Sequence, residues 1–97
     1  MTTYGLVHGA WHSSWHWHLL EAALHDRGGH AVTVDLPCTD SAAGASEYAD
    51  LIVEALASID DDVVLVGHSL GGLTIPLVAA RRPIRRLIFL NAMLPDV

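Results

Sequence analysis

The chain has 97 residues, enough for one domain, and 52% apolar against 16% charged residues predict a folded protein rather than a disordered one. Its net charge of −6 argues against nucleic acid and against an anionic membrane surface as partners. Because the first residues lack a basic segment followed by an apolar one, and no apolar run approaches about 18 residues, we expect a soluble, cytoplasmic protein.

The first third of the chain predicts a strand, a helix and a second strand. A short apolar run predicts a strand over 4–7, and a run rich in β-branched residues predicts another over 31–36. The helix between them should begin at Ser13 or Ser14 and end near Arg27, before two glycines. Its expected core-facing residues are Trp17, Leu20 and Leu24.

The rest of the chain predicts two further helices and two further strands. After a polar loop, Ser46 should cap a second helix, followed by strands over 63–66 and 86–90. The expected apolar stripe of that helix is Tyr48, Leu51, Ile52, Ala55 and Ile59. A third helix is expected over 70–82, kinked at Pro76 because proline removes a hydrogen bond and clashes with the previous turn.

Alternation of strands and helices predicts an α/β fold, a doubly wound parallel sheet of about four strands with helices on both faces. The predicted strand order is 2-1-3-4, counting along the chain. In that order the first and third strands are neighbours at the switch point of the sheet, where ligands bind beyond the carboxyl ends of the strands. The loops over 8–11 and 67–72 leave those two strand ends, so we expect them to meet.

The second of these loops contains the motif G-x-S-x-G, as Gly67-His68-Ser69-Leu70-Gly71. Between a strand and a helix, this motif forms a sharp turn that exposes the serine hydroxyl, so Ser69 is the candidate catalytic nucleophile. A side chain at position 67 or 71 would collide with the turn, which accounts for the two glycines. An idle serine in a glycine-rich turn is the alternative interpretation.

Acyl transfer also needs two N–H donors about 3 Å from the developing oxyanion. We assign them to the backbone of Leu70, which follows the serine, and of Ala10, in the loop after the first strand. Gly9 lets that loop approach the site closely, and Trp11 is a candidate to line the substrate pocket. The predicted catalytic set is therefore Ser69, Ala10 and Leu70, with Gly9 and Trp11 binding substrate.

Together, residues 8–15 and 67–72 resemble the α/β-hydrolase superfamily, in the branch of small esterases that includes plant methyl esterases and hydroxynitrile lyases. Segments 35–37 and 92–96 are also similar to that branch. The lyases typically carry Thr, Glu and Cys at the positions of Gly9, His68 and Leu70, so the resemblance is better to the esterases. It implies a partial α/β-hydrolase core acting on a small-molecule ester, without a cofactor.

In this superfamily the triad acid and histidine follow the serine, and related enzymes are more than twice this length. The resemblance therefore implies that 1–97 is an incomplete, N-terminal half of a hydrolase domain. Serine is a poor nucleophile without a base, so the chain alone should be a poor catalyst. Asp35 and Asp40 precede the serine, contrary to the superfamily order, and neither is proposed as the triad acid.

Seven histidines invite other interpretations. His8 could act as a base, although packing of its loop is the preferred role, and His68 should point away from the site. A metal site of His12, His16 and His18 lacks a carboxylate or thiolate ligand, so no metal is expected. The lone Cys38 allows no internal disulfide and is expected to be a small buried side chain.

The alternative of a different class is a non-catalytic binding or interaction module, a half-hydrolase that has lost turnover. The last strand would leave an apolar edge over 87–90 unpaired. We therefore expect self-association, or pairing with a complementing C-terminal half, through this edge. The substrate itself is not predicted beyond a carboxylic ester.

Overall fold

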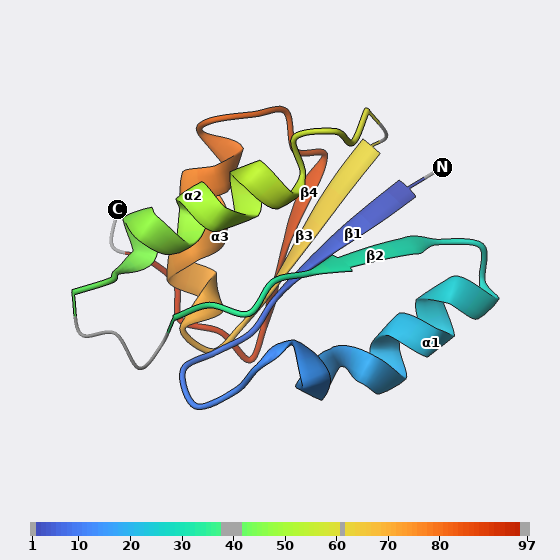
Figure 1. The fold of residues 1–97 in the computed structure, drawn as a ribbon, viewed down its shortest axis with the longest axis horizontal. Coiled ribbons are helices and arrows are strands. Elements are labelled where there is room, and N and C mark those ends of the chain that lie inside the picture. Colours follow the sequence, from blue (N-terminus) through green and yellow to red (C-terminus); the bar gives the residue numbers. More distant parts are fainter. Residues whose placement is uncertain (1, 38–41, 61, 96–97) are drawn as a thin grey trace.

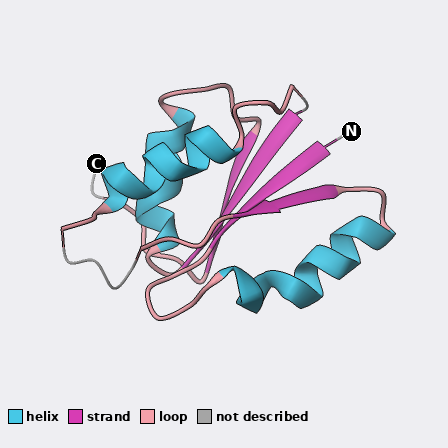
Figure 2. Ribbon diagram, in the orientation of Figure 1, coloured by secondary structure: helices cyan, strands magenta, loops and turns pink. Residues whose placement is uncertain are grey.

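The computed structural model describes residues 2–37, 42–60 and 62–95. Cys38 and Asp40 lie outside these ranges, so their predicted roles stay predictions. Figure 1 labels the strands and α-helices, and Figure 2 shows how strands and helices alternate along the chain. The elements are β1 (Thr2–Val7), the 3-10 helix η1 (Ser14–Trp17), α1 (His18–Asp26), β2 (His30–Thr33), α2 (Ala45–Ala55), β3 (Asp62–His68), α3 (Gly71–Ala79) and β4 (Arg86–Leu90).

The four strands form one parallel sheet in the order β2-β1-β3-β4, which confirms the predicted topology. Helix α1 covers one face of the sheet, while α2 and α3 cover the other (Figure 1). The paired residues Val7 and Gly67 bring the carboxyl ends of β1 and β3 level with each other. The two loops of interest therefore leave the sheet side by side.

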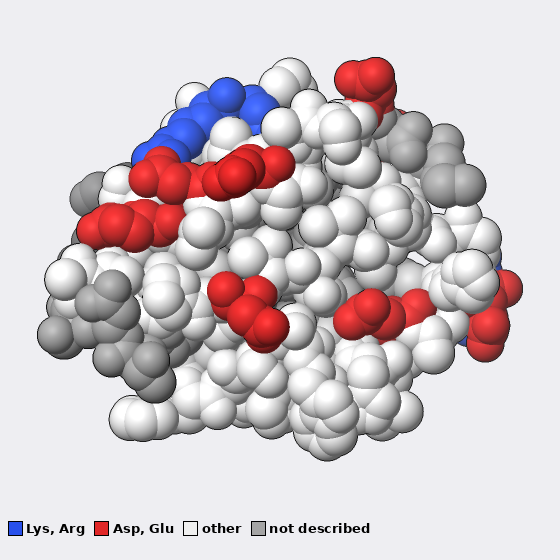
Figure 3. All heavy atoms as spheres, viewed as in Figure 1, with Lys and Arg blue, Asp and Glu red and all other residues white. Residues whose placement is uncertain are grey.

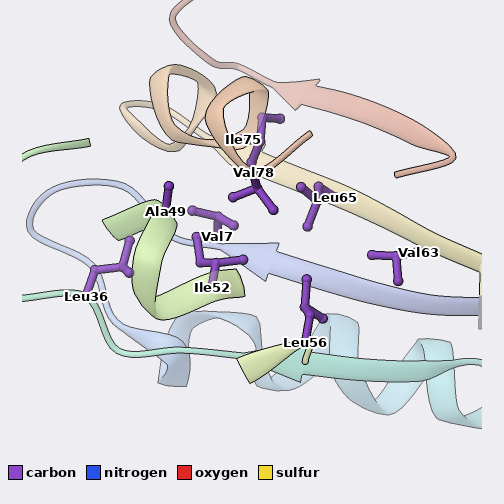
Figure 4. Close-up of a cluster of buried hydrophobic side chains, with 9 residues drawn as sticks. All are labelled: Val7, Leu36, Ala49, Ile52, Leu56, Val63, Leu65, Ile75 and Val78. Carbon is purple, nitrogen blue, oxygen red and sulfur yellow. The ribbon is translucent and has the colours of Figure 1, made fainter. Parts of the chain in front are cut away.

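Two apolar clusters, one on each face, account for this arrangement. Successive residues of β3 belong to different clusters, because side chains along a strand point to opposite faces of the sheet. Leu65 packs toward α2 and α3, and Val66 packs toward α1. On the α1 side the buried residues are Leu6, Trp17 and Val66, with Leu20 and Leu24 against them, as predicted. The larger cluster, drawn in Figure 4, consists of Val7, Leu36, Ala49, Ile52, Leu56, Val63, Leu65, Ile75 and Val78.

Helix α2 differs from its prediction in its first turn and in its buried stripe. Its N-cap is Gly44, and the Ser46 hydroxyl, the predicted cap, instead accepts a hydrogen bond from Arg81 at 3.3 Å. The buried positions are Ala49, Ile52 and Leu56, whereas two predicted core residues, Leu51 and Ala55, are exposed. Tyr48 and Ile59 do pack against the core, as predicted.

Three other boundaries also moved. The first helical turn is a 3-10 turn, in which the His16 N–H donates to the Ser13 carbonyl at 3.1 Å. Strand β2 ends at Thr33 rather than at Leu36, whose N–H turns away to a side chain, described below. Helix α3 continues through Pro76 and ends at Ala79, three residues before the predicted end.

Charged side chains at the surface link neighbouring elements. Arg81 pairs with Asp50 and so joins α3 to α2, and Arg82 donates to the Leu56 carbonyl at 2.7 Å, just beyond the end of α2. Acidic side chains are spread over the face drawn in Figure 3, and the basic ones visible there lie next to acidic ones. Within the described ranges, every helix is too short or too polar to cross a membrane.

Candidate active site

The turn between β3 and α3 (residues 67–71, called the elbow) holds Ser69 in a strained conformation. The φ of Ser69 is 55°, in the left-handed region that serine rarely adopts. A Cβ at Gly67 would lie 2.8 Å from the Gly71 carbonyl oxygen, which confirms the predicted collision. A Cβ at Gly71 would also be excluded, and there it would meet the end of β1, with the Val7 carbonyl oxygen at 2.7 Å.

The loop after β1 (residues 8–12, called the first loop) contains a tight turn. The His12 N–H donates to the Gly9 carbonyl at 3.2 Å, and the third residue of the turn, Trp11, has a φ of 67°, as in type II turns. The turn presses against the elbow, because a Cβ at Gly9 would lie 2.9 Å from the Cβ of Ser69. The structure thus confirms that the two loops meet and that Gly9 permits the close approach.

One peptide group in each loop has its carbonyl held by two donors. The Gly9 carbonyl accepts from the His12 N–H and, at 2.7 Å, from Nδ1 of His8. The Ser69 carbonyl accepts from the N–H groups of Gly72 at 3.1 Å and Met93 at 3.0 Å.

These two clamps set the direction of the next N–H in each loop. The described residues have no cis peptide bond, and a trans peptide holds its C=O and N–H on opposite sides. The Ala10 and Leu70 N–H groups therefore point away from the clamps. Among the described residues, neither N–H has a recorded acceptor.

A cavity of about 190 Å³ lies beside these two peptides. Its walls come from the first loop, the elbow, the segment after β2 and helices α2 and α3. The lining residues are His8, Ala10, Leu36, Tyr48, Leu70, Gly71 and Thr74. Trp11, the predicted pocket residue, is 95% exposed and does not line this cavity. The cavity is mostly apolar and has room for a small group next to the two N–H donors.

Histidines 8 and 68 lie where the preferred interpretation put them. His8 is 3% exposed, and its Nε2 accepts a hydrogen bond from the Leu36 N–H at 2.9 Å. Both of its ring nitrogens are therefore occupied by the backbone, so it holds the loop and is not a free base. The His68 ring faces Trp17, with ring centroids 6.4 Å apart, on the α1 side of the sheet, and does not line the cavity beside Ala10 and Leu70.

The remaining histidines do not converge on a metal site. His16 Nδ1 accepts from the Ser13 N–H at 3.0 Å, and His18 Nδ1 donates to the Trp15 carbonyl at 2.7 Å. In the part of the chain that the structure describes, no three side chains of the His, Cys, Asp or Glu type are placed to hold a metal ion. The His12 and His16 rings instead meet edge to face, with centroids 4.7 Å apart.

Two pKa values near the first loop are shifted. Partial removal from water lowers the pKa of His12, and charge repulsion from the nearby imidazoles of His16 and His68 lowers it further. The pKa of Asp35 is lowered because its carboxylate accepts a hydrogen bond from the Ser14 N–H at 2.8 Å. Asp35 thus fixes the start of η1, a structural role.

Two contacts of the site were not predicted from the sequence. The Met93 N–H reaches the elbow from the end of β4, and a Cβ at Gly72 would clash with the Met93 carbonyl oxygen. The second glycine of the Gly71-Gly72 pair was the sequence signal for this approach. The bond from the Leu36 N–H to His8 has no comparable signal, because it joins residues 28 positions apart.

Comparison with known proteins gives one consistent result. The sequence profile described as "Alpha/beta hydrolase family" matches residues 6–97. Among curated proteins, the chain is 36% identical over 102 residues to an alpha-hydroxynitrile lyase of Arabidopsis thaliana, covering 94% of this chain and 40% of that protein. It is 38% identical over 112 residues to a carbendazim hydrolyzing esterase of Nocardioides sp. (strain SG-4G), covering 99% and 44%.

Solved structures agree with these relatives. Polyneuridine aldehyde esterase superposes with a TM-score of 0.80 at 33% identity, over 99% of this chain and 42% of that one. A pyrethroid hydrolase from Sphingobium faniae JZ-2 gives a TM-score of 0.81 at 28% identity, over 94% and 40%. The chain therefore spans about two fifths of the length of the curated relatives that it matches.

Proposed function

Because this chain belongs to the alpha/beta hydrolase family, we propose that it carries the nucleophile and the oxyanion hole of a carboxylic ester hydrolase. Ser69 is the nucleophile in this proposal, and the Ala10 and Leu70 N–H groups form the oxyanion hole. The observation that carries the proposal is the contact between Gly9 and Ser69, with a doubly held carbonyl on each side of it.

The proposed reaction begins with attack of the Ser69 hydroxyl oxygen on the ester carbonyl carbon, which moves negative charge onto the carbonyl oxygen. Two fixed N–H donors stabilise this charge better than water does, because they need not reorient as the charge develops. Leu70 is also the N-cap of α3, where the helix dipole favours a negative charge. Loss of one such donor typically lowers kcat by a factor of about 10²–10³.

Serine needs a general base to reach ordinary rates. Within the described ranges, no histidine has a recorded hydrogen bond to Ser69, and both ring nitrogens of His8 are already bonded. We propose that the base and its acid belong to polypeptide other than residues 1–97. Without them, we expect hydrolysis only roughly 10³–10⁴-fold faster than the uncatalysed reaction in water.

For the substrate we propose a small ester with a compact apolar group. Support comes from the cavity of about 190 Å³, whose walls include the side chains of Leu36 and Thr74. Several relatives are named as esterases, among them a methylesterase of Arabidopsis thaliana. A small methyl or phenyl ester is accordingly the first substrate to test.

The test is covalent labelling of the 97-residue chain with a fluorophosphonate, read by mass spectrometry of the modified peptide. We expect slow labelling at Ser69, none in S69A, and unchanged labelling in S58A, a matched control at an exposed serine after α2. A wild-type chain that stays unlabelled, or S69A labelled at the wild-type rate, would contradict the proposal.

A second candidate function, a non-catalytic interaction module, is favoured by the edge of β4. Among the residues that the structure describes, this strand pairs only with β3, and Ile88 and Leu90 are 39% and 45% exposed. We propose that a second copy of the chain or a complementing polypeptide pairs with this edge, because unpaired strand edges favour such pairing. Sedimentation should show association that weakens in I88K, whereas a monodisperse monomer at all concentrations would rule the idea out.

A further inference from the structure

We infer that His8 is a positioning residue, whose ring aims the Ala10 N–H into the cavity beside Ser69. The orientation can be tested by itself, and its catalytic consequence rests on the proposed function. The ring is 3% exposed and joins two backbone groups, the Gly9 carbonyl at 2.7 Å and the Leu36 N–H at 2.9 Å.

These two bonds permit only one form of the ring. A carbonyl oxygen can only accept, so Nδ1 must carry the proton that it donates to Gly9. The Leu36 N–H can only donate, so Nε2 must be without a proton. His8 is therefore a neutral imidazole protonated at Nδ1, and a proton on Nε2 would face the Leu36 N–H.

The bond to Gly9 controls the next peptide group. Glycine has a wide range of backbone conformations, so the Gly9–Ala10 peptide plane needs contacts outside the loop to fix it. The His12 N–H, at 3.2 Å, lies within the same turn and moves with it. His8 is held by the end of β1 and by Leu36, so its shorter bond fixes the plane relative to the sheet. The Ala10 N–H lies in that plane and points opposite to the Gly9 carbonyl, so it then faces the cavity.

Amide side chains separate the two bonds. In H8N the amide nitrogen stands near the position of Nδ1 and can donate to Gly9 but does not reach Leu36. In H8Q the amide stands near the position of Nε2. It can accept from the Leu36 N–H, but the Gly9 carbonyl loses the bond from residue 8 and keeps only the one from the His12 N–H. H8F keeps a ring of similar shape and makes neither bond. H25Q, at an exposed position on α1, is the control.

The direct readout is the one-bond N–H residual dipolar coupling of Ala10, which reports the direction of this bond in the full chain. We expect a changed coupling in H8Q and H8F, a smaller change in H8N, and none in H25Q. In the wild type, the imidazole ¹⁵N shifts should show the proton on Nδ1. An unchanged coupling in both H8Q and H8F, or a proton on Nε2, would overturn the inference; if H8F does not fold, H8N against H8Q decides.

The rate of fluorophosphonate labelling at Ser69 gives the functional readout. A misdirected donor should slow labelling in H8Q by about 10²-fold, the lower end of the cost of losing an oxyanion donor. H8N should be labelled faster than H8Q even where thermal denaturation shows equal stability. A purely structural role instead predicts rates that follow stability, and that result would refute a role in positioning. If the wild type is unlabelled but the Ala10 coupling still depends on residue 8, the proposed function fails and the orientation role stands.

Discussion

In the elbow and in the first loop, two hydrogen-bond donors hold one backbone carbonyl, but the donors are of different kinds. In the elbow, the Ser69 carbonyl is held by two backbone N–H groups, those of Gly72 and Met93. In the first loop, one of the two donors to the Gly9 carbonyl is a side chain, that of His8. The elbow should therefore tolerate changes of most side chains and fail when its backbone is displaced, whereas the first loop should depend on one imidazole.

The largest effect should come from displacing the backbone clamp of the elbow. In G72A the new Cβ would clash with the Met93 carbonyl oxygen, so the segment after β4 must move away. Overpacking of this kind typically costs about 1–3 kcal/mol, and a clash with backbone should reach the upper end of that range or exceed it. Urea denaturation measures the loss.

G44A is the matched control for this variant, because no atom of the described residues, apart from its chain neighbours, lies within 4 Å of the new Cβ there. Its cost should be at most about 1 kcal/mol, the ordinary effect of a poorer N-cap. Equal denaturation midpoints for G72A and G44A would show that the end of β4 does not hold the elbow.

A smaller effect should come from separating the two loops. In G9A the new Cβ would lie 2.9 Å from Ser69 Cβ and 3.1 Å from the His68 carbonyl oxygen. We expect a cost of about 1–3 kcal/mol in unfolding free energy and slower labelling of Ser69, because the Ala10 N–H moves away from the elbow. Labelling at the wild-type rate in a folded G9A would mean that the contact between the loops does not matter for reactivity.

The smallest effect concerns the charge around the first loop. Desolvation and neighbouring imidazoles hold the pKa of His12 below its ordinary value of 6.5. As the pH falls below that value the unfolded chain takes up this proton first, so the contribution of His12 to stability is lost down to its folded pKa and then stays constant. H12Q should therefore show a shallower fall in urea midpoint over about pH 8 to 5 than the wild type.

An NMR titration of the His12 ring checks the cause of the shift. H16Q removes a neighbouring imidazole and should raise the pKa of His12 toward its ordinary value, while H25Q should leave it unchanged. The prediction fails if His12 titrates at its ordinary value, or if H12Q and the wild type share one pH profile.

Features of the two loops that depend on near neighbours in the sequence were predictable, and those that depend on distant segments were not. Periodicity and β-branched runs sufficed for the strand order, and the glycines of the elbow implied its tight turn, because steric exclusion acts between near neighbours. The predicted stripe of α2 is correct at Tyr48, Ile52 and Ile59. It is wrong at Leu51, since Leu51 and Leu56 are equally apolar and only tertiary packing buries the second. The bonds from Leu36 to His8 and from Met93 to Ser69 join distant segments, and no local spacing encodes them.

All three tryptophans of the chain lie between positions 11 and 17, two of them exposed at 95% and 66% and the third, Trp17, buried against the α1 face. Intrinsic fluorescence is consequently a spectroscopic probe of one corner of the molecule. A blue-shifted emission can come only from Trp17, and loosening of the α2–α3 layer alone would leave the spectrum nearly unchanged. Far-ultraviolet circular dichroism recorded on the same sample supplies the second probe, and coincident melting curves from the two would mean that both layers unfold together.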